Sequence, residues 1–170
     1  MKEYLPSATF HLRELNNKNE FEWCEIETKD LFSNKKIIIF SLPGAFTPTC
    51  STFQMPGFEK LFQEFTNLGV NSIYCISVND AFVMNEWGKK HNINNLKLIP
   101  DGNSEFTRKM GMLVEKNNLG FGLRSWRYAV ICENYKITNW FVENFFSDNY
   151  SEDPYDKTKP ENILEFLKNK

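Results

Sequence analysis

Apolar residues follow two different spacings in the first half of the chain, and each spacing predicts a different element. Residues 35–42 are nearly all apolar and rich in β-branched side chains, which is typical of a central strand buried on both faces. From residue 49 to residue 68, apolar side chains recur at i, i+3, i+4 and i+7, which indicates a helix with Gly69 as its C-cap. We expect Pro56 and Gly57 to bend this helix near its start.

The same two spacings repeat directly afterwards. Residues 72–78 predict a strand, and Asn79 or Asp80 is expected to cap a helix that runs to about residue 90. A strand–helix–strand–helix order favours a largely parallel sheet with right-handed crossovers. The chain is therefore predicted to be an α/β protein.

The two ends of the chain add antiparallel elements. Residues 11–29 predict a β-hairpin with its turn at residues 16–19. Further on, we expect a short strand at 96–99, a short helix at 104–110, an antiparallel hairpin formed by 126–132 and 137–142, and a polar loop at 147–159. Pro160 is expected to open a last helix at its N1 position, with one face formed by Ile163, Leu164 and Leu167.

Length and composition indicate one domain that spans residues 1–170. The chain has 41% hydrophobic residues and shows no break in composition, so it can form a single substantial core. A formal charge of −2 gives no general phosphate-binding surface, and we expect no nucleic-acid partner. No apolar run approaches the roughly 20 residues that span a bilayer, so no membrane association is expected.

The cysteines argue against a metal site and against a disulfide framework. The chain contains no CxxC pair and no histidine at metal-ligand spacing from a cysteine. A chain with this much core material does not need disulfides, so a reducing intracellular compartment is expected. Two of the four cysteines, Cys24 and Cys132, are predicted to be buried in strands.

Cys50 is the candidate nucleophile. It follows the predicted central strand and would enter the first turn of the next helix, where free backbone N–H groups and the helix dipole favour a thiolate. Pro43 can shield the sulfur from water, and Thr47 carries a hydroxyl three residues before it. Taken alone, these residues also fit a proline-rich turn with Thr49 as N-cap and an inert cysteine.

The amino-acid pattern of this loop favours the interpretation of Cys50 as a nucleophile. The pattern PxxxTxxC, here Pro43, Thr47 and Cys50, resembles the peroxidatic loop of the peroxiredoxins, and the full PGAFTPTCS is similar to their type-five and plant type-II branch. The segments 75–84, 101–106 and 120–129 resemble the same branch, in order and at similar spacing. The lack of a C-terminal resolving cysteine and the Asn-rich background resemble the one-cysteine antioxidant peroxiredoxins of plasmodial plastids.

This resemblance implies a thioredoxin-like fold, with a central mixed sheet flanked by helices, and the reduction of hydroperoxides. Cys50 would be the peroxidatic cysteine that becomes a sulfenic acid. By the same resemblance, Thr47 would hydrogen-bond the peroxide and the sulfur, and Pro43 would limit solvent access. Arg127 in RSWRYA matches the family arginine that stabilises the thiolate, although Arg124 lies close enough to be confused with it. The resemblance implies no metal and no bound cofactor, only an external thiol.

The chain departs from the two-cysteine members in how its cysteine would be regenerated. Animal relatives carry a resolving cysteine before the last helix, but residues 147–159 contain none. Cys75 aligns with a plant resolving cysteine, yet it lies within an apolar strand, where a thiol tends to be buried and inert. We therefore expect resolution by an external thiol, with glutathione and glutaredoxin as the reductants that the resemblance implies, and keep a Cys50–Cys75 cycle as the alternative.

Three other interpretations make different demands on the sequence. A thiol-disulfide reductase would need CxxC, and a hydrolase-type pair would need His11 or His91 beside Cys50. A non-enzymatic role, as a redox-signalling partner or holdase, is the remaining alternative. The resemblance further implies a homodimer that meets near Phe46, Phe82 and residues 120–126, and a plastid location if a presequence was removed, otherwise the cytosol or mitochondrion.

Overall fold

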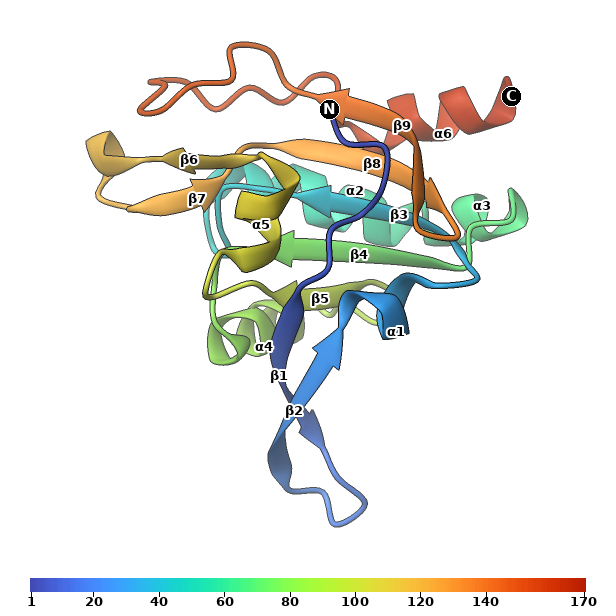
Figure 1. Ribbon diagram of the computed structural model, residues 1–170, viewed down its shortest axis with the longest axis vertical. Helices are drawn as coiled ribbons and strands as arrows, with labels where there is room; N and C mark the ends of the chain where they lie inside the picture. The colour runs from blue at the N-terminus through green and yellow to red at the C-terminus, as the bar shows by residue number, and fades with distance from the viewer.

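A five-stranded mixed sheet lies at the centre of the computed structural model, which describes residues 1–170 (Figure 1). Its strand order is β5-β4-β3-β8-β9. The strands are β3 (Lys36–Ser41), β4 (Ser72–Ser77), β5 (Lys97–Pro100), β8 (Tyr128–Glu133) and β9 (Lys136–Val142). The first three run parallel to one another, and β8 and β9 add the antiparallel hairpin. This arrangement confirms the predicted thioredoxin-like fold.

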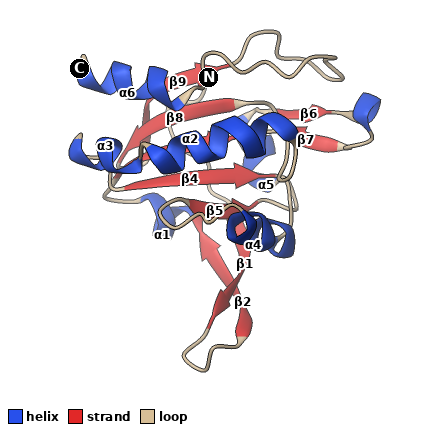
Figure 2. Cartoon of the chain, turned by 180° about the vertical axis from the view of Figure 1, so that it is seen from behind, coloured by secondary structure: helices blue, strands red, loops and turns tan.

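Helices cover both faces of the sheet. One face carries α2 (Met55–Lys60), α3 (Phe62–Asn67), α4 (Ala81–Lys90) and α6 (Pro160–Lys168), which lie in front of the strands in Figure 2. The other face carries α1 (Thr28–Phe32), α5 (Glu105–Met110) and the N-terminal segment. None of these helices combines the length and the apolar content that a membrane crossing requires.

Side chains alternate between two cores along the central strand, as expected for a strand buried on both faces. Ile37 and Ile39 point into the core that α1 and α5 cover, whereas Ile38 and Phe40 point into the core under α2, α4 and α6. The two cores contain 19 and 18 buried residues, so the sheet is covered about equally on its two sides. Cys50 belongs to the second core.

Local signals in the sequence place most of the element ends correctly. Asp80 caps α4 by accepting a hydrogen bond from the backbone N–H of Val83 at 2.9 Å, as predicted. Asn134 and Tyr135 adopt positive φ angles in the tight turn between β8 and β9. Pro160 occupies the first turn of α6 and is buried with the predicted apolar face.

The N-terminal hairpin forms as predicted but stands away from the sheet (Figure 1). It consists of β1 (Thr9–Leu15) and β2 (Phe21–Glu27). Asn16 closes its turn, because its side-chain oxygen accepts hydrogen bonds from the backbone N–H groups of Lys18 and Glu20. Since neither core reaches the far part of the hairpin, Cys24 is only half-buried, and its predicted burial is wrong.

Two further expectations need correction. The helix after Cys50 begins with a π-helical turn over Cys50–Gln54, which ends two residues before Pro56, and it is interrupted at Leu61, where no break was predicted. The segment before β8 forms a small separate hairpin, β6 (Leu113–Glu115) with β7 (Leu123–Ser125), joined by a short 3₁₀ turn at Asn117–Leu119. β8 therefore begins at Tyr128 rather than at residue 126.

Residues 147–159 contain no helix or strand and connect β9 to α6, as predicted. We call this segment the strap. In Figure 1 it extends along the top of the molecule, beyond β9 and close to β6 and β7. The strap contributes side chains to the site described next.

Candidate active site

Cys50 lies in the first turn of a helix, as the sequence predicts. Helical geometry begins at Pro48, and the backbone N–H of Ser51 donates to the Thr47 carbonyl at 3.0 Å. The loop before it leaves the end of β3, so the central strand positions the cysteine at the edge of the sheet. The Cys50 side chain is 0% exposed, and its sulfur therefore lies in a water-poor environment.

Arg127 reaches the sulfur because of the register between two strands. Ser41, the last residue of β3, pairs with Tyr128, so Arg127 lies beside the start of the Cys50 loop. Ala129 points into the core that contains Cys50, and Arg127 is two residues earlier, on the same face. Its Nη1 donates to Cys50 Sγ at 3.4 Å, and the Arg127 side chain is almost fully buried.

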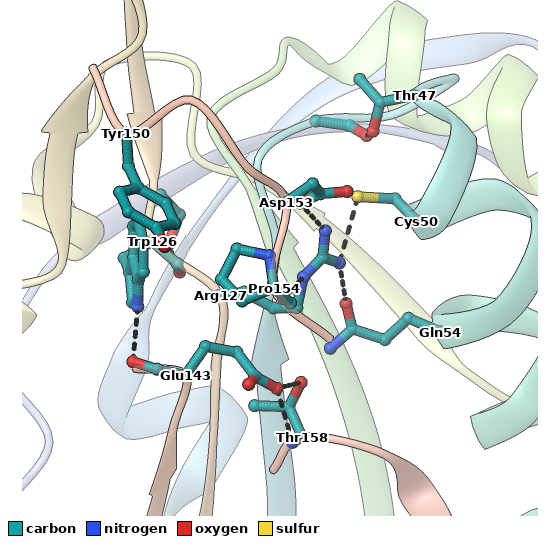
Figure 3. A network of polar contacts seen from close by, with 12 residues as sticks. Thr47, Cys50, Gln54, Trp126, Arg127, Glu143, Tyr150, Asp153, Pro154 and Thr158 are labelled. Atoms are coloured by element: carbon teal, nitrogen blue, oxygen red, sulfur yellow. Dashed lines mark hydrogen bonds and ion pairs between the residues drawn. The ribbon is translucent and has the colours of Figure 1, made fainter. Parts of the chain in front are cut away.

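Three other groups hold the same guanidinium (Figure 3). Nη1 also donates to Gln54 Oε1, Nη2 forms an ion pair with Asp153, and Nε donates to the Pro154 carbonyl at 3.0 Å. Burial by itself lowers the pKa of Arg127, but the charges of Cys50 and Asp153 raise it above its ordinary value. The arginine thus stays charged beside the sulfur.

Arg124, the other arginine of the RSWRYA segment, binds backbone carbonyls instead of the cysteine. It donates to the Val78 carbonyl at 2.8 Å and to the Phe121 carbonyl at 3.0 Å, and it forms no hydrogen bond with Cys50. Of the two neighbouring arginines, only Arg127 contacts the cysteine, which agrees with the match of this segment.

Thr47 and Pro43 lie beside the cysteine in different ways. The Thr47 hydroxyl donates its proton to the Gly44 carbonyl at 2.7 Å and forms no hydrogen bond with the sulfur, so its predicted bond to Cys50 is absent here. Its lone pairs can still accept a hydrogen bond from an incoming group. Pro43 is buried and, with Thr47 and Asp153, lines an open pocket of about 290 Å³.

None of the other titratable side chains considered from the sequence forms a hydrogen bond with the sulfur. Cys75 is 0% exposed in the same core as Cys50, and burial raises the pKa of its thiol well above the ordinary value. Cys132 is buried in a strand, as predicted; it lies in the opposite core, where burial raises its pKa to about 12. His11 pairs with Glu25, and His91 packs edge-on against Trp87, so neither forms a Cys–His pair with Cys50.

Four residues of the site were not identified from the sequence. Gln54 follows Cys50 by four positions on one helix and could have been recognised from that spacing. Asp153 and Pro154 come from the strap, which has no periodicity to reveal its course. Glu143 anchors the strap: its Oε1 accepts hydrogen bonds from Asp156 N–H, Thr158 N–H and the Thr158 hydroxyl at 2.8–2.9 Å (Figure 3).

One residue of the expected dimer surface, Trp126, is buried, so that part of the expectation is wrong. Trp126 is 2% exposed and donates through its Nε1 to the Glu143 carbonyl at 3.0 Å, so it belongs to the interior. Phe46 and Phe82 are 47% and 55% exposed, and both remain available to a partner.

Comparisons with known proteins agree with this geometry. The profile of the Redoxin family matches residues 6–157. A peroxiredoxin from Rhizobium etli is 55% identical, over 99% of this chain and 96% of its own, and Peroxiredoxin-2D from Arabidopsis thaliana is 41% identical, over 66% of this chain and 70% of its own. The crystal structure of the Plasmodium falciparum antioxidant protein, a 1-Cys peroxiredoxin, superimposes with a TM-score of 0.91 at 39% identity, over 99% of both chains.

Proposed function

Because the chain belongs to the Redoxin family, as a peroxiredoxin of the type-five and plant type-II branch, and is therefore a thiol-dependent peroxidase, we propose that Cys50 reduces hydrogen peroxide and alkyl hydroperoxides and is regenerated by glutathione and glutaredoxin. The observation that carries this proposal is the 3.4 Å contact between Arg127 Nη1 and Cys50 Sγ in a fully buried site. A fixed cation at that distance stabilises an anionic sulfur where water cannot.

In the oxidative half-reaction, the Cys50 thiolate attacks one oxygen of the peroxide. The S–O bond forms as the O–O bond breaks, the sulfur becomes a sulfenic acid, and the second oxygen leaves as hydroxide or alkoxide and takes up a proton. The Arg127 guanidinium stabilises the negative charge as it moves from sulfur to the leaving oxygen. The Thr47 hydroxyl donates its hydrogen to the Gly44 carbonyl, so its oxygen accepts a hydrogen bond from the incoming peroxide and orients it.

Pro43 and the strap keep this reaction out of bulk water. Pro43 is buried in the loop that precedes Cys50, and Asp153 and Pro154 bind Arg127 from the strap. In such a low-dielectric site, each charge-assisted hydrogen bond contributes about 2–3 kcal/mol to the transition state, which corresponds to roughly 100-fold in rate.

In the reductive half-reaction, an external thiol supplies the electrons. A glutathione thiolate attacks the sulfenic sulfur, an S–S bond forms, and the oxygen leaves as water after protonation. A second thiol, that of glutaredoxin or another glutathione, then attacks the glutathione sulfur and releases the Cys50 thiolate. Burial of Cys75 and the absence of cysteine from the strap support this one-cysteine cycle over an internal disulfide.

The proposal is tested by peroxide turnover with glutathione and glutaredoxin, run in parallel on the wild type, Cys50→Ser and Cys75→Ala. We expect equal turnover in wild type and Cys75→Ala, none in Cys50→Ser, and a Cys50 sulfenic or glutathionylated mass after one equivalent of peroxide. Loss of turnover in Cys75→Ala, with a Cys50–Cys75 disulfide in the wild type, would instead make Cys75 the resolving cysteine. Absence of turnover in the wild type with any thiol would favour a binding or signalling role.

A further inference from the structure

Lys116 is a buried ammonium group that forms no ion pair. The residue is 3% exposed, and its Nζ donates one hydrogen bond, to the Tyr150 carbonyl of the strap at 3.1 Å. The group also lies 5.2 Å from the centroid of the buried Trp126 ring, in a cation–π contact. It forms no ion pair with a carboxylate, and burial lowers the pKa of Lys116. An ammonium has three N–H donors, so two of them have no acceptor in the protein.

The nearby acidic side chains do not neutralise this charge. Asp153 forms its ion pair with Arg127 rather than with Lys116; its charge raises the pKa of Lys116, but burial has the larger effect and lowers it. Glu152 is exposed to solvent on the strap and forms no ion pair with Lys116. A buried cation without a counter-ion is costly, and an anion bound beside it would recover part of that free energy.

Lys116 lies on the wall of the pocket that opens beside the cysteine loop. This pocket, of about 290 Å³, is lined by Pro43, Thr47 and Thr49 on the loop side and by Glu152 and Asp153 on the strap side. A second, much smaller cavity is lined by both Lys116 and Arg127. A molecule in the larger pocket would thus contact both the ammonium group and the segment that presents the reacting sulfur.

We propose that this pocket binds a co-substrate that carries a carboxylate, and that Lys116 Nζ holds the carboxylate. The thiol reductant is the favoured source, because the pocket combines a buried cation with the exposed carboxylate of Glu152 and so matches a thiol that carries both an anionic and a cationic group. A hydroperoxide with a carboxylate tail is the other source of the same chemistry. The inference rests on the proposed function, since it assigns the recognition of the reductant to a residue that does not react itself.

The thiol arm of the test compares three small thiols in the reduction of the Cys50 sulfenic acid, followed by stopped-flow fluorescence. These are glutathione, 3-mercaptopropionate, which is anionic, and 2-mercaptoethanol, which is neutral. In Lys116→Met, which keeps the apolar stem against Trp126, we expect the ratio of the anionic to the neutral rate constant to fall about 10- to 100-fold. A purely structural role of Lys116 would slow all three thiols equally and leave this ratio unchanged.

Lys97→Met is the matched control. Lys97 is an exposed lysine on the edge strand β5 that lies 5.7 Å from the Tyr74 ring centroid, and it lines no part of the pocket. Its replacement removes the same charge and a similar cation–π contact, and we expect the thiol ratio to stay at the wild-type value.

The peroxide arm measures oxidation of Cys50 by tert-butyl hydroperoxide and by a fatty-acid hydroperoxide. A selective loss with the fatty-acid hydroperoxide in Lys116→Met, and with unchanged thiol ratios, would assign the carboxylate to the oxidant and retain the site. Unchanged ratios in both arms overturn the inference, even if turnover with glutathione is normal. If the wild type has no thiol-dependent turnover, the proposed function itself fails, which is a different result.

Discussion

Asp153 and Cys50 bind the same guanidinium group. Cys50 Sγ accepts from Arg127 Nη1 at 3.4 Å, while Asp153 pairs with Nη2 of the same side chain. The one arginine thus serves two anionic partners when Cys50 is a thiolate, and each partner lowers the positive potential that the other experiences. The balance between them sets how readily the sulfur ionises and how strongly the strap is held.

Replacement of Arg127 by Met should slow the oxidation of Cys50 by hydrogen peroxide about 100-fold or more, because the buried cation that stabilises the thiolate and the leaving oxygen is lost. Stopped-flow fluorescence with excess peroxide measures the rate constant. Arg124→Met is the control, since Arg124 bonds only to backbone carbonyls nearby. An equal loss in both variants would show that disruption of the loops, not charge, causes the effect.

Replacement of Asp153 by Asn should speed the alkylation of Cys50 at pH 7. The substitution removes a negative charge from Arg127 and leaves more of its potential for the thiolate. Alkylation by iodoacetamide at a fixed pH, followed by mass analysis of the Cys50 peptide, measures the rate. Asp156→Asn, on the same strap but paired with Lys159, should leave the rate unchanged, and slower alkylation in Asp153→Asn would contradict the argument.

Replacement of Glu143 by Ala should destabilise the fold by about 2–4 kcal/mol, because two backbone N–H groups and the Thr158 hydroxyl lose their buried acceptor. Glu143→Gln keeps an acceptor oxygen and should lose less. Urea unfolding measures the free energy, and hydrogen exchange at Asp156 and Thr158 reports the strap directly. If exchange there stays as slow as in the wild type, Glu143 is not the anchor of the strap.

The buried thiols should make the protein less stable above pH 8.5. Burial raises the pKa of Cys75 and of Cys132 above that of an unfolded cysteine, so the unfolded state loses these protons first and is favoured as the pH rises. Each thiol should cost about 2 kcal/mol of the free energy of unfolding between pH 8 and pH 10. Urea unfolding of wild type and Cys132→Ala at both pH values measures the contribution of Cys132, and an equal pH dependence in the two proteins would contradict it.

Periodicity predicts most of the sheet and the helices of this chain, because the burial of one or both faces of an element determines the spacing of its apolar residues. The alternation of Ile37 to Phe40 between two cores leaves one strand assignment, and Asp80 caps its helix through a local hydrogen bond that the sequence shows directly. Cys24 is the counterexample: the hairpin pattern is correct, but no local rule tells that the hairpin extends past the cores. The position of Trp126 in the interior likewise depends on the strap above it.

The residues of the site also fall into two groups, those that the sequence predicts and those that it does not. The positions of Cys50 beside a helix start and of Arg127 beside it follow from a loop motif and a strand register. Asp153 and Pro154 depend on how an irregular segment crosses the molecule, and that course is fixed by a distant residue, Glu143, whose charge alone gives no hint of its partners. The Thr47 hydroxyl shows a further limit, since its choice of the Gly44 carbonyl over the sulfur depends on a single side-chain rotamer.

The complete burial of Cys50 makes the enzyme a filter by size as well as by chemistry. A water-sized sphere cannot touch the sulfur, so hydrogen peroxide reaches it only through a small opening of the site. A tripeptide thiol or a protein thiol needs the π-helical turn of Cys50–Gln54 or the strap to open first. At high thiol concentration, reduction should therefore reach a plateau set by the frequency of opening, and under a burst of oxidant the sulfenic acid would persist long enough to meet a second peroxide.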